Sequence, residues 1–265
     1  MFNDLLDTWQ HRDLMKDLAA RELRIRYLGS LMGKYWNVLH PLIVISIYTL
    51  IFAKLLGVRS HNPESTSGWT YAAFLCAGLL PWNFFSEMLL KATNSFSEYS
   101  HLIRKIRFPL LVLHCSVGIS TAASFLIMIV LYLLFLLVIG QPLTINLLLL
   151  PIVFSLQVVF TLGLALITSV LNTFFRDVQH LLGVSLQLLF WGTPVIYTTG
   201  QVPVRYLWIL NLNPMTHCIG LYRSAFLGLP VEFNSLIIFS VVAIATFTVG
   251  IGVISRAKSE ILDLV

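Results

Sequence analysis

Charged residues are scarce in this chain. Asp, Glu, Lys and Arg make up 11% of its 265 residues, against about 25% in soluble domains. None of them occurs between residues 108 and 175. Hydrophobic residues make up 57% of the chain, and the mean hydropathy is +0.85. This composition excludes an ordinary soluble domain and indicates an integral membrane protein.

The missing charges also limit the chemistry available inside the membrane. Intramembrane enzymes and ion-coupled transporters need ionisable groups at membrane depth, although each costs about 2.5 to 3.5 kcal/mol. Glu87 is the one carboxylate close to the interior of a predicted span, and His40, His114 and His217 are scattered. We therefore do not expect a membrane glycosyltransferase, a lipid phosphatase or a proton-coupled transporter.

Cysteine is scarce as well, and no nucleotide-binding motif is present. Cys76, Cys115 and Cys218 lie far apart without CxxC spacing, so neither a metal site nor a disulfide framework is indicated. Residues 29–35 resemble a GxxxxGK[ST] loop, but they are one residue short between the glycines and lack the hydroxyl residue. We expect no ATP hydrolysis, metal or cofactor in this chain.

Apolar windows predict an all-α integral membrane protein with six spans. A spanning helix needs about 20 mostly apolar residues to cross roughly 30 Å of hydrocarbon. Such windows lie near residues 35–56, 69–90, 110–139, 147–172, 178–195 and 233–255. The charged first 34 residues exclude a signal peptide. Of the 17 Lys and Arg residues, all except Lys54, Arg59, Arg205 and Arg223 fall on the side of the termini, so both termini are predicted to be cytoplasmic.

Residues 1–34 are predicted to form an amphipathic helix on the inner membrane surface. One side of this helix carries an apolar arc, which Arg21 and Glu22 interrupt. It consists of Leu14, Met15, Leu18, Ile25 and Leu28. An ordinary solvated helix is the alternative.

Residues 192–229 do not read as a regular helix. Gly192, Pro194, Gly200 and Pro203 break the helical pattern. The apolar stretch that follows contains Asn211, Asn213, His217 and Arg223. Irregular backbone at membrane depth requires cover by protein or a water-filled cavity. We therefore predict a re-entrant element on the outer side between spans five and six, with a surface loop and an interfacial helix as the alternative.

A series of motifs in this order resembles ABC-2 type exporter permeases. It runs through RELRIRY at 21–27, GLLPWNFF at 78–85, LNTFFRD at 171–177, FWGTPVIY at 190–197 and NPM at 213–215. The likeness is greatest to O-antigen polysaccharide permeases, with capsule and teichoic acid permeases as near relatives. A small-molecule or drug exporter of the same class is the serious alternative.

The resemblance implies one membrane domain over residues 1–265 that forms a homodimer in the cell inner (cytoplasmic) membrane. It also implies export of a lipid-linked polysaccharide, driven by two copies of a cytoplasmic ATPase subunit that binds ATP and magnesium. Membrane lipids are the other expected partners, and nucleic acid is not expected. Six helices are few for enclosing a hydrated sugar chain, so we expect the passage at the seam between two copies.

Candidate channel residues are aromatic, because sugars bind through aromatic faces together with a few polar groups. They lie on the first, second and fifth predicted spans: Tyr48, Phe52, Trp82, Phe84, Phe85, Trp191 and Tyr197. Core packing or a position in the membrane-interface belt is the alternative for each of them.

Two inner segments are candidates for contact with the ATPase. In the loop at 94–107, a short helix would present Leu102, Ile103 and Ile106 to a groove, and basic groups to an acidic rim. The resemblance places the coupling helix in this loop. The predicted contacts are Arg104, Lys105, Ile106 and Arg107, together with Arg176 and Asp177 at the next inner turn. Topology anchoring and a local ion pair are the alternatives.

Basic residues near the first span are candidates for binding the diphosphate of the lipid carrier that the resemblance implies. They are Arg21, Arg24, Arg26 and Lys34. Binding of ordinary lipid headgroups is the alternative.

Overall fold

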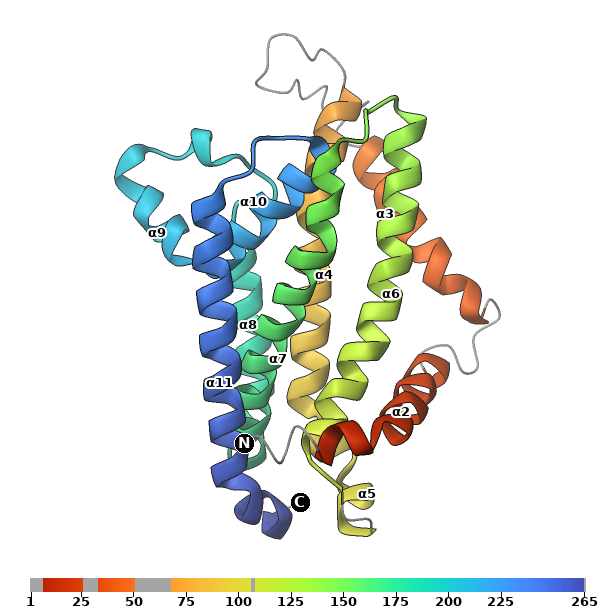
Figure 1. Cartoon of the computed structure of the whole chain (residues 1–265), viewed down its shortest axis with the longest axis vertical. Helices are drawn as coiled ribbons and strands as arrows, with labels where there is room; N and C mark the ends of the chain where they lie inside the picture. The colour runs from red at the N-terminus through yellow and green to blue at the C-terminus, as the bar shows by residue number, and fades with distance from the viewer. Residues whose placement is uncertain (1–6, 26–32, 51–67, 106–107, 265) are drawn as a thin grey trace.

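The computed structural model describes residues 7–25, 33–50, 68–105 and 108–264, and every element in these ranges is a helix (Figure 1). This confirms the all-α prediction for the described residues. In chain order the α-helices are α2 (Arg12–Ile25), α3 (Trp36–Thr49), α4 (Gly68–Glu98), α5 (Ser100–Lys105), α6 (Leu111–Val138), α7 (Leu150–Phe174), α8 (Val178–Trp191), α9 (Leu207–Leu212), α10 (Pro214–Leu227) and α11 (Phe233–Leu264). Short 3₁₀ helices are η1 (Gly33–Tyr35), η3 (Ile145–Leu149), η4 (Thr199–Gln201) and η5 (Val204–Tyr206).

Four helical segments in the described ranges are long and apolar enough to cross a membrane. They are Tyr71–Glu98, Leu111–Val138, Ile145–Phe174 and Phe233–Leu262. Helix α8 is apolar but has 14 residues, which gives about 21 Å of length. Helix α3 is described over 14 residues. Four of the six predicted spans therefore occur as spanning helices, and the two near 35–56 and 178–195 stay predictions.

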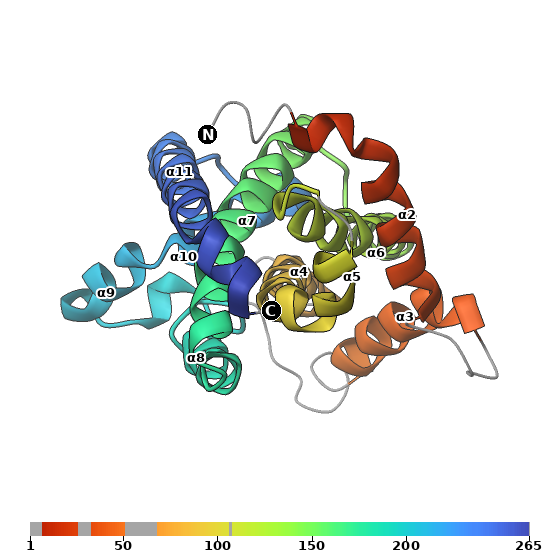
Figure 2. The same cartoon turned by 90° about the horizontal axis from the view of Figure 1, so that it is seen from below.

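Helix α4 is the central helix of the bundle. In its apolar window 72% of the residues are buried, against 33% in α6, 33% in α7 and 28% in α11. Viewed from below, α4 lies between α6, α7, α8 and α3 (Figure 2). The helix continues to Glu98 rather than ending near residue 90, because Ala92 and Phe96 are buried among the neighbouring helices. Tertiary packing therefore extends this helix beyond its apolar window.

The long helices alternate in direction and define two ends of the bundle. The end that carries α5 and the end of α11 is called the lower end, and the end that carries α9 and α10 is called the upper end (Figure 1). Helices α7 and α11 approach most closely at two glycines. A Cβ atom at Gly163 would lie 2.5 Å from the Phe247 nitrogen, and one at Gly250 would lie 2.6 Å from the Gly163 oxygen. Small residues thus allow this close packing.

Helix α2 packs against the lower end of the bundle. Met15, Leu18 and Ala19 are buried, and Met15 and Leu18 belong to one core cluster with Ile103 and Ile261. Leu14 is partly buried against the same cluster, so three members of the predicted apolar arc contact protein. Ile25 is half exposed, and Leu28 lies outside the described residues.

The chain becomes irregular after Trp191, where α8 ends with Gly192 as its C-cap, as the helix breakers predict. Helix α10 begins at Pro214, and the side chain of its N-cap Asn213 accepts a hydrogen bond from the Met215 amide at 3.0 Å. It ends at Leu227, and the positive φ of 69° at its C-cap Gly228 suits glycine. Eleven of the 14 residues of α10 are buried.

A series of two buried hydrogen bonds joins α10 to the central helices. The Tyr222 hydroxyl donates to Gln157 Oε1 on α7 at 2.7 Å. Gln157 Nε2 in turn donates to the Pro81 carbonyl of α4, also at 2.7 Å. All three residues are buried. The polar groups at this depth therefore satisfy one another.

Further side-chain donors bond to carbonyl groups of the irregular segments and of the last turn of α10. Tyr71 of α4 donates to Ile196 at 3.0 Å, and Arg223 of α10 donates to Val195 at 2.6 Å. Asn146 donates to the carbonyls of Ser224 and Leu229 at 3.2 and 3.0 Å. Side chains from the helices thus supply hydrogen bonds that a helical ladder would otherwise provide.

Candidate functional site

One face of α4 carries a stripe of polar side chains. Asn83, Ser86, Glu87, Lys91 and Asn94 share one face, because residues three or four apart in a helix are neighbours on its surface. Each of the five is partly exposed, whereas Trp82, Phe85, Met88 and Leu89 between them are buried. In an otherwise apolar span, this surface can offer hydrogen bonds to a polar substrate. We call it the α4 stripe.

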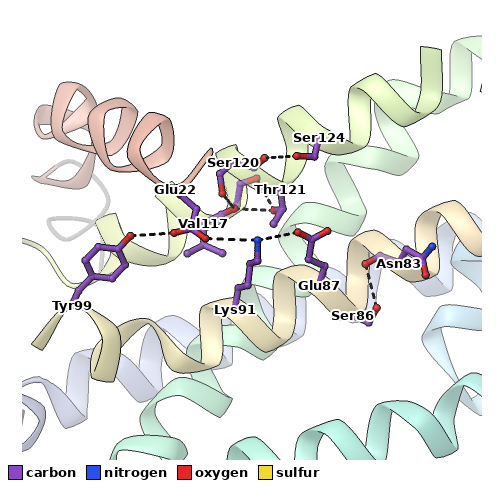
Figure 3. A network of polar contacts seen from close by, with 11 residues as sticks. Glu22, Asn83, Ser86, Glu87, Lys91, Tyr99, Val117, Ser120, Thr121 and Ser124 are labelled. Atoms are coloured by element: carbon purple, nitrogen blue, oxygen red, sulfur yellow. Dashed lines mark hydrogen bonds and ion pairs between the residues drawn. The ribbon is translucent and has the colours of Figure 1, made fainter. Parts of the chain in front are cut away.

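An ion-pair network lies at the lower part of the α4 stripe (Figure 3). Lys91 Nζ is 3.0 Å from Glu87 Oε1 on its own helix and 3.7 Å from Glu22 Oε1 on α2. The Tyr99 hydroxyl donates to Glu22 Oε2 at 3.3 Å. Figure 3 shows Glu87 and Lys91 pointing toward α2 and toward the hydroxyl residues Ser120, Thr121 and Ser124 of α6. The network connects α2 to the central helix.

Tyr99 remains a hydrogen-bond donor at physiological pH. Its burial, followed by the negative charge of Glu22, raises the pKa of Tyr99 to about 12. The phenol therefore keeps its proton and donates a hydrogen bond to the Glu22 carboxylate.

The α4 stripe and its ion pairs were missed by the reasoning from sequence, although a signal was present. Glu87 and Lys91 are four residues apart in a favourable orientation, which is the spacing of a helical ion pair. Asn83, Ser86 and Asn94 extend the same helical face. The contact of Lys91 with Glu22 carries no local signal, because the two residues belong to different helices.

The predicted channel aromatics divide into two groups in the structure. Trp82, Phe84 and Phe85 are buried in the core of the single chain. Trp82 lies 5.6 Å from Phe190 between ring centroids, Phe84 lies 4.9 Å from Phe125, and Phe85 lies 5.8 Å from Phe160. These rings already take part in packing, and their channel role stays a prediction.

The second group of aromatics lies at the upper end of α8. Trp191 is 65% exposed, and the half-buried Tyr197 donates its hydroxyl to the Trp191 carbonyl at 3.0 Å. The structure brings these two residues together. Of the other candidates, the side chain of Tyr48 and all of Phe52 lie outside the described residues.

The predicted ATPase contacts lie on two segments. Arg104 and Lys105 are exposed at the end of α5, and Arg176 and Asp177 are exposed between α7 and α8. Neither Arg176 nor Asp177 forms an ion pair within the part of the chain that the structure describes. Ile106 and Arg107 lie outside the described residues.

The prediction that α5 presents Ile103 to a partner is wrong. Ile103 is only 7% exposed and packs in the lower core with Met15 and Leu18 of α2. The cause is tertiary packing, because Ile103 joins a core cluster that also contains residues of α4, α6 and α11. The exposed surface of α5 is therefore basic rather than apolar.

The predicted diphosphate ligands are placed only in part. Arg21 and Arg24 are exposed on α2. Arg26 lies outside the described residues, as does the side chain of Lys34 in η1. Among the described residues, no group of three or more His, Cys, Asp and Glu side chains could hold a metal ion.

These features define a helical membrane protein whose polar surfaces are a stripe on its central helix and a basic lower end. The ABC-2 type transporter family matches residues 14–227. This match covers most of the chain, and the chain therefore belongs to the ABC-2 type transporter family.

Individual relatives extend the likeness over nearly the full length. The O-antigen export system permease protein RfbA of Klebsiella pneumoniae is 28% identical over 253 residues, which are 95% of each chain. The protein of the same name from Myxococcus xanthus is 34% identical over 223 residues, which are 83% of this chain and 82% of that one. The polysialic acid transport protein KpsM of Escherichia coli is 26% identical over 237 residues, which are 86% and 88% of the two chains.

Replacing Lys91 by Met is expected to loosen α2. The change removes the cation that lies between the partly buried carboxylates of Glu87 and Glu22, at a cost of about 1 kcal/mol, which corresponds to roughly fivefold faster local opening. Hydrogen exchange of the α2 amides in detergent-solubilised protein measures this opening. Lys91→Arg should restore slow exchange.

The matched control is Lys16→Met, which removes an exposed ion pair with Asp13 inside α2. Little change is expected there, because exposed pairs contribute little. Equal acceleration in the two Met variants would show that the network does not hold α2 in place.

Proposed function

We propose that this chain is the membrane-spanning permease subunit of an ABC transporter that exports a lipid-linked, O-antigen-like polysaccharide. The similarity to O-antigen export permeases over 95% of both chains carries this proposal. The subunit itself is not an enzyme, and a separate ATPase subunit supplies the energy. Capsule or teichoic acid polymers are close alternatives, and the relative that transports polysialic acid favours a polymer over a small molecule.

In the proposed topology the chain crosses the inner membrane six times. The regions of α3 and α8 supply the two crossings beyond the four long helices. The lower end faces the cytoplasm, because most Lys and Arg residues lie on that side. Helix α2 then lies at the inner membrane surface, where Arg21 and Arg24 can meet the diphosphate of the lipid carrier.

At the outer side, the segment from Gly192 to α10 forms the proposed re-entrant element. Helix α10 has 14 residues and lies at the upper end of the bundle, so it does not cross to the lower end (Figure 1). Its burial and the side-chain hydrogen bonds of Tyr71, Gln157 and Arg223 support a position at membrane depth.

The proposed path for the polymer follows the α4 stripe and emerges near Trp191 and Tyr197. Two copies of the chain would enclose it, because one copy leaves the stripe partly exposed. Sugar hydroxyls require hydrogen-bonding groups along such a path, and the α4 stripe provides amide, hydroxyl and charged groups in an otherwise apolar span.

Two copies of the ATPase subunit are proposed to dock at the lower end. The exposed basic end of α5 and the turn at Arg176 and Asp177 supply the contacts. A basic surface of this kind attracts acidic rims on a partner and orients their encounter. Motion of the ATPase would then reach the bundle through α5 and the buried Ile103.

Asn83→Leu combined with Ser86→Leu is expected to reduce polymer export by roughly tenfold, because it removes hydrogen-bonding groups from the proposed path. Surface polymer is measured in cells that carry the variant as their only copy, and membrane abundance of the protein is measured in parallel. Lipid-linked polymer should accumulate inside these cells.

The matched control is Ser155→Leu on the exposed face of α7, where the hydroxyl bonds only to its own helix at Pro151. Export should stay at the normal level in this control. Unchanged export in the double variant would contradict the path along α4, and normal surface polymer in cells that lack the whole chain would contradict the proposed function.

Reversing the charges with Arg104→Glu and Lys105→Glu is expected to lower co-purification of the ATPase subunit by about tenfold, because like charges repel at an acidic rim. Membrane insertion should not change. Arg205→Glu at the upper end serves as the control for charge reversal. Docking would lie elsewhere if the α5 variant and this control retained the ATPase equally.

A further inference from the structure

A cavity of about 670 Å³ is lined by residues of α9, α10 and the start of α11, the helices that lie at the upper end in Figure 1. Its volume falls in the range of roughly 300 to 1,000 Å³ that is usual for small-ligand sites. Most side chains that line it are polar, and the residues important here are Phe74, Thr216, Arg223, Glu232 and Ser235. It is separate from the α4 stripe.

Arg223 is a buried cation in the wall of this cavity. Arg223 is only 6% exposed. The guanidinium carbon lies 3.6 Å from the centroid of the Phe74 ring, and Nη2 donates to the Val195 carbonyl at 2.6 Å. Nε has no hydrogen-bond partner, and no carboxylate of the described residues pairs with Arg223. A buried arginine keeps its charge, and burial without an anion is costly.

A second unpartnered donor lines the same cavity. Thr216 is 8% exposed, and its buried hydroxyl has no hydrogen-bond partner. It lies in the first turn of α10, while Ser235 lies in the first turn of α11. Two helix amino termini therefore meet at the cavity, and each contributes positive potential from its backbone.

We propose that this cavity binds a phosphate group, with the Arg223 guanidinium and the Thr216 hydroxyl as donors. A phosphate supplies the missing counter-charge of Arg223 and accepts hydrogen bonds from both unpartnered groups. A neutral sugar fits less well, because Phe74 is the one Phe, Tyr or Trp residue among the described residues that line the cavity, and Arg223 occupies its face. The phosphate can belong to a lipid headgroup of the outer leaflet or to a soluble phosphate ester.

Glu232 sets the affinity of this site from its rim. The residue is exposed, and its Oε2 accepts a hydrogen bond from the Ser235 hydroxyl at 2.9 Å. Its negative charge opposes an incoming phosphate. Glutamine has the same shape and can accept the same hydrogen bond, so Glu232→Gln removes the repulsion with little structural change.

The test measures how probes shift the thermal unfolding of the full-length protein in an uncharged detergent. The probes are glycerol phosphate and short-chain phosphatidylglycerol, with diacylglycerol of matching chain length and glucose as neutral controls. Midpoints recorded over a concentration series give apparent affinities. Stabilisation by phosphatidylglycerol alone identifies a lipid headgroup, and stabilisation by glycerol phosphate as well identifies a site open to soluble esters. Either result supports the proposal.

Three substitutions make the result specific. Thr216→Val should weaken phosphate binding by about tenfold, because a hydrogen bond to a charged acceptor is lost. Without probe its unfolding midpoint should stay unchanged or rise, since a buried unsatisfied hydroxyl disappears. Glu232→Gln should strengthen binding by roughly threefold. Thr246→Val is the control, because that hydroxyl bonds only to its own helix at Val242 and Ala243.

Arg223→Gln should abolish phosphate binding. This substitution also removes the hydrogen bond to the Val195 carbonyl. If the Arg223 variant does not fold, the Thr216 and Glu232 variants decide the outcome. The proposal is overturned if neither phosphate probe stabilises the protein more than its neutral control. It is equally overturned if Thr216→Val and Glu232→Gln bind the probes with the affinity of the unmodified chain.

Discussion

The structure depends on the need to satisfy polar groups where water is scarce. At the upper end the chain leaves helical geometry, so its carbonyl groups lose the partners that a helix supplies. Tyr71, Asn146 and Arg223 donate to these carbonyls, and Gln157 links Tyr222 to α4. A short buried helix and an irregular segment can then pack against long apolar helices while these carbonyls keep hydrogen-bond partners.

The same constraint explains why α4 has two faces. The face that packs in the centre of the bundle is apolar and aromatic, whereas the partly exposed face carries the α4 stripe. Its charged members are paired, since Lys91 lies between Glu87 and Glu22. Pairing lowers the cost of charge near the membrane, and it also ties α2 to the central helix. In the proposed transporter, one helix therefore provides both the structural core and the substrate path.

The sequence predicted local features well and long-range ones poorly. The end of α8 at Gly192 and the start of α10 after Asn213 follow from helix breakers and a capping side chain, which act within a few residues. The central position of α4 and the burial of Ile103 depend on helices packed from elsewhere in the chain. The hydrogen bond from Tyr222 to Gln157 joins residues 65 positions apart, and no local sequence pattern predicts it. The prediction of channel aromatics on α4 rests on residue type alone. Helical spacing shows instead that the aromatic residues lie on the buried face of α4 and the polar residues lie on its partly exposed face.

The central claim is that the polymer passes along the α4 stripe. A photoreactive side chain in place of Ser86 tests it directly in membranes that contain the permease, its ATPase and the lipid-linked polymer. During ATP-driven export, illumination should attach polymer to residue 86, and the same group in place of the exposed Ser155 of α7 should attach only lipid. Equal attachment of polymer at both positions, or none at residue 86 while export proceeds, would contradict the account.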